Sequence, residues 1–341
     1  MRSSNRVLKQ KNRKRASSVD VAKRAGVSQA TVSRVFSKQD TVSEATRLKV
    51  VQAAEELGYN PNAIARGLIQ NATNIIGIVM LRFMNPFYAY MLKNFTLELL
   101  NRGYVSMLFA IDDEREIEEA LPKALQYYVD GLIITSATLS SRMAEGCVHT
   151  GTPVVLVNRY TGLKGINTVR TDNVGGGRRI AEYFIERRFK KIAYLAGETG
   201  SSTNLDRRKG FVERLGEGGL KLETEVSGDY SYESGYELGK ELLTSKNRPD
   251  AVFCANDLMA FGLMDVARSV CGLNVPEDLA VVGFDDIPMS SWPVYSLTTY
   301  HQPVDSLVEE TIDVLLGAIN NPESEAVTKV LSGDLIERGS A

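Results

Sequence analysis

The spacing of apolar residues along the chain changes near residue 75. Before that point, apolar side chains recur three or four residues apart in short stretches, a period typical of amphipathic helices. After it, continuous apolar runs such as IIGIVML at 75–81 alternate with amphipathic stretches, which is typical of buried strands joined by helices. The pattern therefore predicts a small all-α head followed by a larger α/β core.

Two short helices joined by a tight turn are expected at the start of the head. Ser18 is expected to cap a helix over 18–25, and Gly26 permits the left-handed turn that reverses the chain. Ser28 is expected to cap the second helix. That helix places two valines on its inner face, Val32 and Val35. A helix pair of this kind is typical of a helix-turn-helix, although the bare pattern is also that of an unrelated helical hairpin.

A third helix is expected between Ser43 and Gly58, because serine is a favourable residue at the N-terminal cap of a helix and glycine at the C-terminal cap. Its apolar face is expected to contain Leu48, Val51, Ala54 and Leu57.

The outer face of the second helix carries short polar groups and one long cation, which suit phosphates and base edges. Glutamine matches adenine, alanine contacts the thymine methyl group and arginine matches guanine, so Gln29, Ala30 and Arg34 are the expected base-reading residues. The candidate DNA-binding residues of the head are Ser18, Ser28, Gln29, Ala30, Thr31, Ser33 and Arg34.

The core contains two successive sets of strands and helices. Strands are expected at 75–81, 105–110, 131–137 and 153–157, and then at 191–196, 251–255 and 279–284, with amphipathic helices between them. Such alternation predicts two lobes, each a doubly wound parallel sheet. Ligands of open α/β sheets bind at the carboxyl ends of the strands, so the loops that follow the strands are the candidate site.

Charge is distributed unevenly along the chain. Residues 1–70 contain fourteen Lys and Arg against five Asp and Glu, whereas the remaining residues contain 26 against 37. A basic head on an acidic body indicates a polyanionic partner for the head alone. Residues 1–17 carry seven cations and no acid, so this tail is expected to be disordered in isolation. It is either a solvated tail or an electrostatic arm that adds phosphate contacts.

Several function classes are excluded by what the sequence lacks. The cysteines, Cys147, Cys254 and Cys271, show no CxxC spacing, which indicates reduced cytosolic thiols, and the two histidines make a zinc site improbable. No phosphate-loop spacing and no GxSxG motif is present, so neither a cofactor nor hydrolase chemistry is expected. Without a signal peptide or an apolar run of about 20 residues, we expect a cytoplasmic protein with no membrane contact.

The stretch VAKRAGVSQATVSRVFS resembles the DNA-binding signature of the lactose repressor and galactose repressor family, and NPNAIARGL resembles that family's hinge helix. The resemblance implies a hinge that folds on the operator and inserts a leucine into the minor groove. Asn62, Ala65 and Leu68 are the matching DNA-binding residues here. Gly67 stands where the family often has serine, so we expect a looser hinge. The implied divisions are a tail at 1–17, a DNA-binding domain at 18–59, a hinge at 60–74 and a core at 75–341.

The core resembles that of the same family, which is similar to periplasmic sugar-binding proteins. This architecture implies three crossings between the lobes, near Thr171, near Tyr300 and close to the C-terminus. The N-lobe then comprises about 75–171 and 303–330, and the C-lobe about 172–300 and the C-terminal end.

Polar and aromatic residues follow several of the predicted strands, at positions that match effector contacts in the family. The candidate effector-binding residues are Arg82, Asn85, Phe87, Tyr88, Asn158, Arg159, Thr203, Arg207, Tyr230, Asn256, Asp257 and Asp285. Each of them also has a structural explanation, such as a helix cap, so the cluster is the stronger indication.

Three arginines at these strand ends, Arg82, Arg159 and Arg207, indicate an anionic effector such as a sugar acid or a phosphosugar. Arg82 stands where an acid is common in the family. The alternative is that acids of this chain compensate the arginines, namely Asp172, Asp257 and Asp285.

We interpret the chain as a homodimeric transcription regulator, most simply a repressor, that binds a pseudo-palindromic operator and responds to a small effector between its lobes. It is not expected to be an enzyme. The alternatives are a regulator of the same fold controlled by a protein partner, and a solute-binding protein that does not bind DNA. The missing signal peptide and the basic head argue against the latter.

Overall fold

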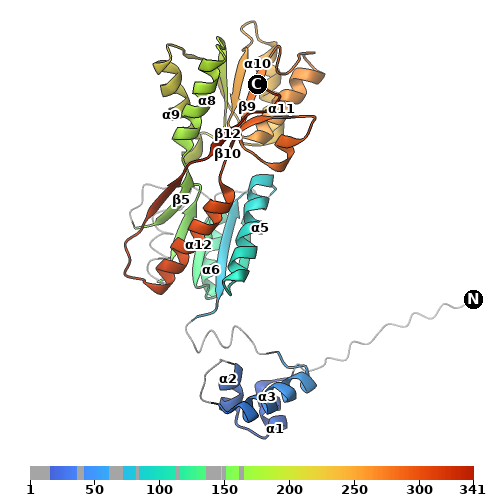
Figure 1. The fold of residues 1–341 in the computed structure, drawn as a ribbon, viewed down its shortest axis with the longest axis vertical. Helices are drawn as coiled ribbons and strands as arrows, with labels where there is room; N and C mark the ends of the chain where they lie inside the picture. Colours follow the sequence, from blue (N-terminus) through green and yellow to red (C-terminus); the bar gives the residue numbers. More distant parts are fainter. Residues whose placement is uncertain are drawn as a thin grey trace, which may run out of the picture. The chain divides into compact units, whose positions relative to one another are not determined.

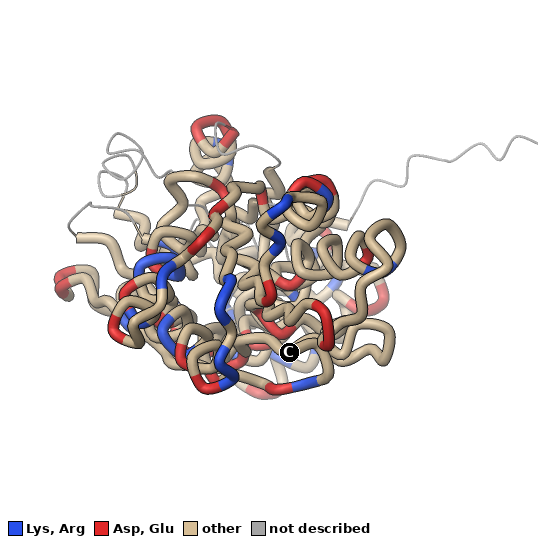
Figure 2. The backbone as a smooth tube through the Cα atoms, turned by 90° about the horizontal axis from the view of Figure 1, so that it is seen from above, with Lys and Arg blue, Asp and Glu red and all other residues tan. Residues whose placement is uncertain are grey.

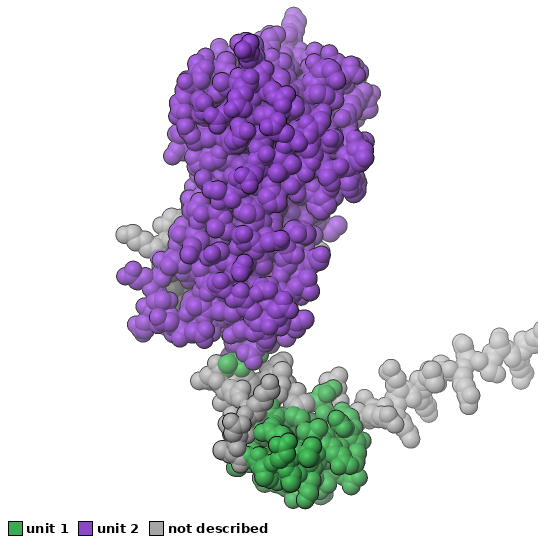
Figure 3. Space-filling model, in the orientation of Figure 1, with its two compact units in different colours: residues 1–73 green, residues 74–341 purple. Residues whose placement is uncertain are grey.

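The computed structural model describes residues 16–36, 42–60, 72–81, 84–111, 116–135, 147, 151–160 and 165–341. The chain forms two compact units, Met1–Thr73 and Asn74–Ala341 (Figure 3).

The first unit contains a helix-turn-helix followed by a third helix: α1 (Ser18–Ala25), α2 (Gln29–Phe36) and α3 (Glu44–Leu57). The expected cap of α1 is wrong by one residue, because Ser17 Oγ accepts from the Asp20 amide and the Asp20 carboxylate accepts from the Ser17 amide. The turn at Gly26 is confirmed by its φ of 68°. Ser28 caps α2 as predicted, since its Oγ accepts from the Thr31 amide at 3.1 Å.

The buried face of α3 differs from the prediction. Val50, Ala53 and Ala54 are buried, whereas Leu48 is 63% exposed and Val51 and Leu57 are also exposed. Two short helices can cross closely only where the side chains between them are small, and α3 packs on α1. The contact face of α3 therefore consists of Val50, Ala53 and Ala54. These residues form one apolar cluster with Val21 and Ala22 of α1 and with Val32 and Val35 of α2. Gly58 ends α3 as predicted, with a φ of 62°.

The second unit contains two sheets, as the alternating pattern predicted, but each has six strands where four and three were expected. The first comprises β1 (Ile75–Leu81), β2 (Val105–Ile111), β3 (Gly131–Ile134), β4 (Val154–Val157), β5 (Asn167–Thr171) and β11 (Thr328–Leu331), in the order β11-β5-β4-β3-β1-β2. The second comprises β6 (Ile192–Ala196), β7 (Leu222–Ser227), β8 (Ala251–Cys254), β9 (Ala280–Asp285), β10 (Thr298–His301) and β12 (Asp334–Ile336), in the order β12-β10-β9-β8-β6-β7. Neighbouring strands are parallel except for β10 and β12.

Each sheet has its own helices. α5 (Pro86–Asn101), α6 (Ile117–Gln126) and α12 (Val304–Asn320) pack on the first sheet, and α8 (Asn173–Glu186), α9 (Ser202–Glu217), α10 (Tyr232–Thr244) and α11 (Asp257–Ser269) accompany the second (Figure 1). A 3-10 turn, η2, spans Pro288–Ser291. The chain passes to the second sheet after β5, returns after β10, and passes over again between β11 and β12. We call the two halves of the second unit the first and the second lobe.

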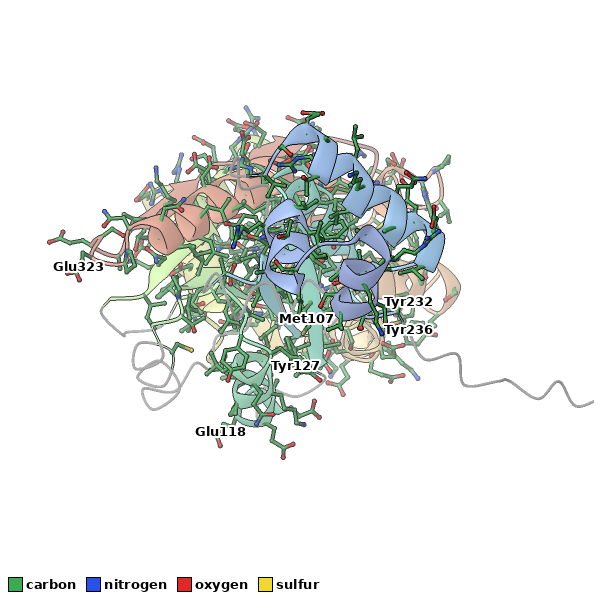
Figure 4. All side chains as sticks on the ribbon, turned by 90° about the horizontal axis from the view of Figure 1, so that it is seen from below. Met107, Glu118, Tyr127, Tyr232, Tyr236 and Glu323 are labelled. Atoms are coloured by element: carbon green, nitrogen blue, oxygen red, sulfur yellow. The ribbon has the colours of Figure 1, made fainter. Side chains whose placement is uncertain are left out.

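Apolar packing is organised by these layers. A large cluster contains Phe95 of α5, Phe211 of α9 and Phe253 of β8. A smaller one lies between α6 and the first sheet, and Met107 of β2, labelled in Figure 4, packs against it. Charged residues of both signs are interspersed along the described backbone (Figure 2). No helix among the described residues is long and apolar enough to cross a bilayer.

Candidate effector site and DNA-binding face

A small cavity lies between the two lobes, at the carboxyl ends of their strands. It is lined by Asn85, Phe87, Tyr88, Asn158, Arg159, Thr203, Arg207, Tyr230, Asn256, Asp285 and Gln302. Ten of the twelve predicted effector residues are thus brought together around one space. Of the other two, Arg82 lies outside the described residues, and Asp257 does not line the cavity.

Arg207 is a buried cation that contacts two neutral hydrogen-bond acceptors and one acid. It extends from α9, whose first turn is capped by Ser201. Its Nε donates to Asn173 Oδ1 at 2.8 Å and its Nη1 to the Ala255 carbonyl at 2.5 Å, while Nη2 lies 3.7 Å from Asp285 Oδ1. The guanidinium also lies 3.6 Å from the centre of the Phe284 ring. These partners fix its orientation toward the cavity.

Asp285 ends β9 and is the acidic side chain of the cavity lining. Burial raises the pKa of its carboxyl to about 7, although the nearby Arg207 opposes the shift. Burial therefore disfavours the charged form of this carboxyl. The cavity lining thus holds two arginines, Arg159 and Arg207, and one acid.

Asp172 and Asp257, the other acids considered as partners for the arginines, are engaged elsewhere. Asp172 caps α8 by accepting from the Gly175 amide at 2.8 Å. Asp257 accepts from the Ile287 amide, the Ser290 hydroxyl and the Thr299 hydroxyl, and so ties α11 to η2 and β10. Burial raises the pKa of Asp257. Of the three candidate acids, only Asp285 forms an ion pair with Arg207 among the described residues.

Gln302 lines the cavity and was not predicted. Its Oε1 accepts from Asn158 Nδ2 at 2.6 Å and from Thr171 Oγ1 at 2.7 Å. Its Nε2 donates to Asp285 Oδ1 at 2.6 Å. Gln302 directly follows β10. The strand-end rule, by which ligands of open α/β sheets bind at the carboxyl ends of the strands, selected Asn158 and Asp285 and would have selected Gln302 as well.

One wall of the cavity is aromatic. The Tyr230 hydroxyl lies 2.9 Å from Ser201 Oγ and 3.1 Å from Thr203 Oγ1, and Arg159 Nη1 donates to Thr203 Oγ1 at 3.0 Å. The Tyr230 ring needs a glycine beneath it, since a Cβ at Gly197 would lie 2.1 Å from the ring. This wall thus combines an aromatic face with hydroxyl groups and a cation.

Two lining residues also cap helices, which is the structural role that the sequence offered as an alternative to effector binding. Asn85 Oδ1 accepts from the Phe87 amide at the start of α5, and Asn256 Oδ1 accepts from the Met259 amide at the start of α11. Asn256 Nδ2 also donates to the Tyr230 carbonyl. Phe87 and Tyr88, in the first turn of α5, pack edge to face against each other.

The outer face of α2 is open for binding. Gln29, Ala30, Ser33 and Arg34 are exposed, and Thr31 is half-buried. Gln29 Nε2 donates to Ser18 Oγ at 3.0 Å, which joins the start of α1 to the start of α2. Asn62, Ala65, Leu68 and residues 1–15 lie outside the described residues. Within the described part of the chain, no group of three or more His, Cys, Asp or Glu residues is arranged to hold a metal ion.

Comparisons with known proteins agree with this architecture. The family model of bacterial regulatory proteins, lacI family, matches residues 19–62, and that of the periplasmic binding protein-like domain matches residues 181–341. The ribose operon repressor of Escherichia coli (strain K12) is 35% identical over 326 residues, which cover 94% of this chain and 98% of the repressor.

A second relative is the HTH-type transcriptional repressor PurR of Erwinia tasmaniensis, 35% identical over 329 residues that cover 94% of this chain and 95% of PurR. A solved structure of the Lac repressor dimer bound to operator and the anti-inducer ONPF has a TM-score of 0.87 and 28% identity, over 96% of this chain and 99% of that one.

Proposed function

We propose that this protein is controlled by a small effector bound between its lobes. It belongs to the lacI family of bacterial regulatory proteins and is a DNA-binding transcriptional repressor rather than an enzyme. The observation that carries the proposal is the cavity itself, because residues far apart in sequence and from both lobes line it. A ligand that touches both lobes favours one arrangement of them over others.

We propose further that the effector is a small anionic sugar derivative, such as a sugar acid or a phosphosugar. Arg159 and Arg207 face one cavity, and the pKa of Asp285 is raised to about 7, so the site favours a negative ligand. Asn158, Thr203 and Asn256 offer hydrogen bonds to hydroxyl groups, and the Tyr230 ring suits the apolar face of a sugar.

The head is proposed to bind a pseudo-palindromic operator as part of a homodimer. The exposed residues of α2 support this role, with Gln29, Ala30 and Arg34 as base readers, and the similar Lac repressor was solved as a dimer on its operator. Residues 18–59 then form the DNA-binding domain, 60–74 the hinge and 75–341 the effector and dimerisation core. Because a repressor acts where the chromosome lies, the proposal includes a cytoplasmic location.

Effector binding is proposed to change operator affinity through the arrangement of the lobes, with a coupling free energy of about 1–3 kcal/mol. The cavity favours a metabolite over a protein partner as the regulator, since it lies between the lobes and mostly buried side chains line it.

A thermal-shift panel tests the effector class. D-Ribose, ribonate and ribose 5-phosphate are compared at equal concentration, followed by other neutral sugars with their acid and phosphate forms. Stabilisation by an anionic member, and its loss in Arg207→Ala and Arg159→Ala, supports the proposal. If a neutral sugar stabilises the protein while its anionic counterparts do not, the anionic effector is excluded and the repressor function is unaffected.

A further inference from the structure

A polar cluster joins the two lobes outside the effector cavity. Tyr160 follows β4 and Arg170 lies in β5, so both belong to the first lobe, whereas Asp206 lies on α9 in the second. The Tyr160 hydroxyl donates to Asp206 Oδ1 at 2.9 Å, and Arg170 Nη1 donates to Asp206 Oδ2 at 3.0 Å. None of the three residues lines the cavity.

The two charged members of the cluster are less exposed than those of an ordinary surface ion pair. The side chain of Asp206 is 11% exposed and that of Arg170 is 22% exposed, and the Arg170 guanidinium lies 4.8 Å from the centre of the Tyr160 ring. Burial raises the pKa of Tyr160, and its hydrogen bond to Asp206 raises it further, so the hydroxyl stays protonated and donates. Charge-assisted bonds of limited exposure are stronger than exposed ones, which contribute little.

Two members of the cluster are adjacent in sequence to cavity residues. Tyr160 follows Arg159, and Asp206 precedes Arg207, so the cluster lies one residue from each of the two cavity cations. Arg159 also donates to Thr203 of α9 at 3.0 Å, and the Tyr160 amide to Ser202 at 3.4 Å. The segment after β4 is thus attached to the first turns of α9.

We propose that Asp206 is a positioning residue: it holds the lobes together through Tyr160 and Arg170, and so brings Arg159 and Arg207 to the same cavity from opposite lobes. Both oxygens of one carboxylate bond to the other lobe, so separation of the lobes breaks both bonds at once. The consequence for effector binding rests on the proposed function, but the contact between the lobes does not.

The test measures the separation of the lobes directly, without any effector. Nitroxide labels are placed on Met84→Cys of the first lobe and Glu233→Cys of the second in a Cys271→Ser background, since Met84 and Glu233 are exposed. Double electron–electron resonance on the full chain, diluted with unlabelled protein so that labelled pairs lie within one subunit, gives the distance distribution. Asp206→Asn is expected to shift it toward longer distances, and Asp206→Glu to recover most of the original distribution.

The matched control is Glu217→Gln on the same helix. Glu217 accepts two hydrogen bonds from Arg178 of α8, at 2.9 and 2.7 Å, so this pair lies within the second lobe and its loss leaves the distribution unchanged. If Asp206→Asn proves poorly folded by circular dichroism, Tyr160→Phe, which removes a single hydroxyl, is used instead. An unchanged distribution in a folded variant of either kind, or an equal shift in Glu217→Gln, overturns the proposal while leaving the effector proposal intact.

Discussion

Gln302 donates from its side-chain amide to Asp285 across 2.6 Å, and so connects the residue after β10 to the residue that ends β9. The same side chain accepts from Asn158 and Thr171 of the first lobe. Gln302, at the second crossing between the lobes, is therefore hydrogen-bonded to Thr171 at the first crossing and to the Asp285 carboxyl of the candidate effector site. A network of this kind is sensitive to the loss of one member, because the remaining polar groups stay buried without partners.

Replacement of Gln302 by leucine is expected to lower the free energy of unfolding by about 1–3 kcal/mol, because Asn158, Thr171 and Asp285 each lose a hydrogen bond while buried. Urea denaturation measures the loss. Gln126→Leu, at the exposed end of α6, is the matched control and is expected to change stability by less than about 0.5 kcal/mol. Equal effects of the two substitutions would show that the network adds nothing.

The contact between His301 and Asp286 gives stability that depends on pH. His301 Nδ1 lies 3.0 Å from Asp286 Oδ2, and this hydrogen bond raises the pKa of His301 above its ordinary value of 6.5, against the effect of burial. The charges of Asp286, Asp334 and Asp305 add to the shift. Because the folded state favours the protonated imidazole, the stabilisation is complete below about pH 6.5. It is lost as the pH rises through the raised pKa that His301 has in the folded state.

The measurement is the difference in Tm between the protein and His301→Gln, at about pH 5.5 and about pH 8.5. The difference is expected to be larger at the lower pH. The raised pKa of Asp285 also makes stability depend on pH, but in both variants, so it cancels in the difference. A difference that is the same at both pH values would contradict the assignment.

Arg34 is exposed on α2 and is predicted to contact guanine in each half-site. Arg34→Ala is expected to cost about 1–3 kcal/mol of operator affinity and to relax preference at one base pair per half-site. Selection from a randomised DNA pool, followed by fluorescence anisotropy on the selected operator, gives both quantities. A loss that is uniform across all sequences would instead make Arg34 a phosphate contact.

Leu68, in the predicted hinge, is expected to insert between base steps in the minor groove. Leu68→Ala should retain the fold while losing roughly 1–3 kcal/mol of specific binding, because an apolar wedge stabilises a bent duplex that makes further contacts. Anisotropy and a gel assay of DNA bending measure the change. Unchanged affinity together with unchanged bending would leave Leu68 as a linker residue.

The basic tail is expected to act through phosphates alone. Deletion of residues 1–15 should flatten the dependence of binding on salt, because fewer counterions are released, and should leave sequence preference intact. Affinities for operator and for unrelated DNA are compared over a range of salt concentrations. An unaltered slope would show that the tail does not touch DNA.

Local chemistry was enough to predict most of the elements. The left-handed turns at Gly26 and Gly58 and the caps at Ser28 and Asn256 depend on neighbours within a few residues, so the sequence alone carries them. Long apolar runs likewise marked the buried central strands of both sheets. The edge strand β7 was not predicted because its side chains alternate between half-buried and exposed, and its sequence, LETEVS, is largely polar.

Contacts between distant residues decided the rest. The face of α3 that is buried depends on where α1 crosses it, which selected Val50 and Ala53 over the larger Leu48. Asp257 and Asp285 both follow or end a strand, yet only Asp285 lines the cavity, because Ser290 and Thr299 surround the Asp257 carboxylate.

The strand-end rule selected which residues of the sequence meet between the lobes, since parallel strands all end at one edge of their sheet. It did not determine which of them bond to one another. The pairing of Asp206 with Tyr160 and Arg170 joins residues 36 to 46 positions apart on two lobes, and no local pattern encodes it. Such contacts exist only once both sheets have folded and the three crossings hold them in register, so the tertiary structure alone decided them.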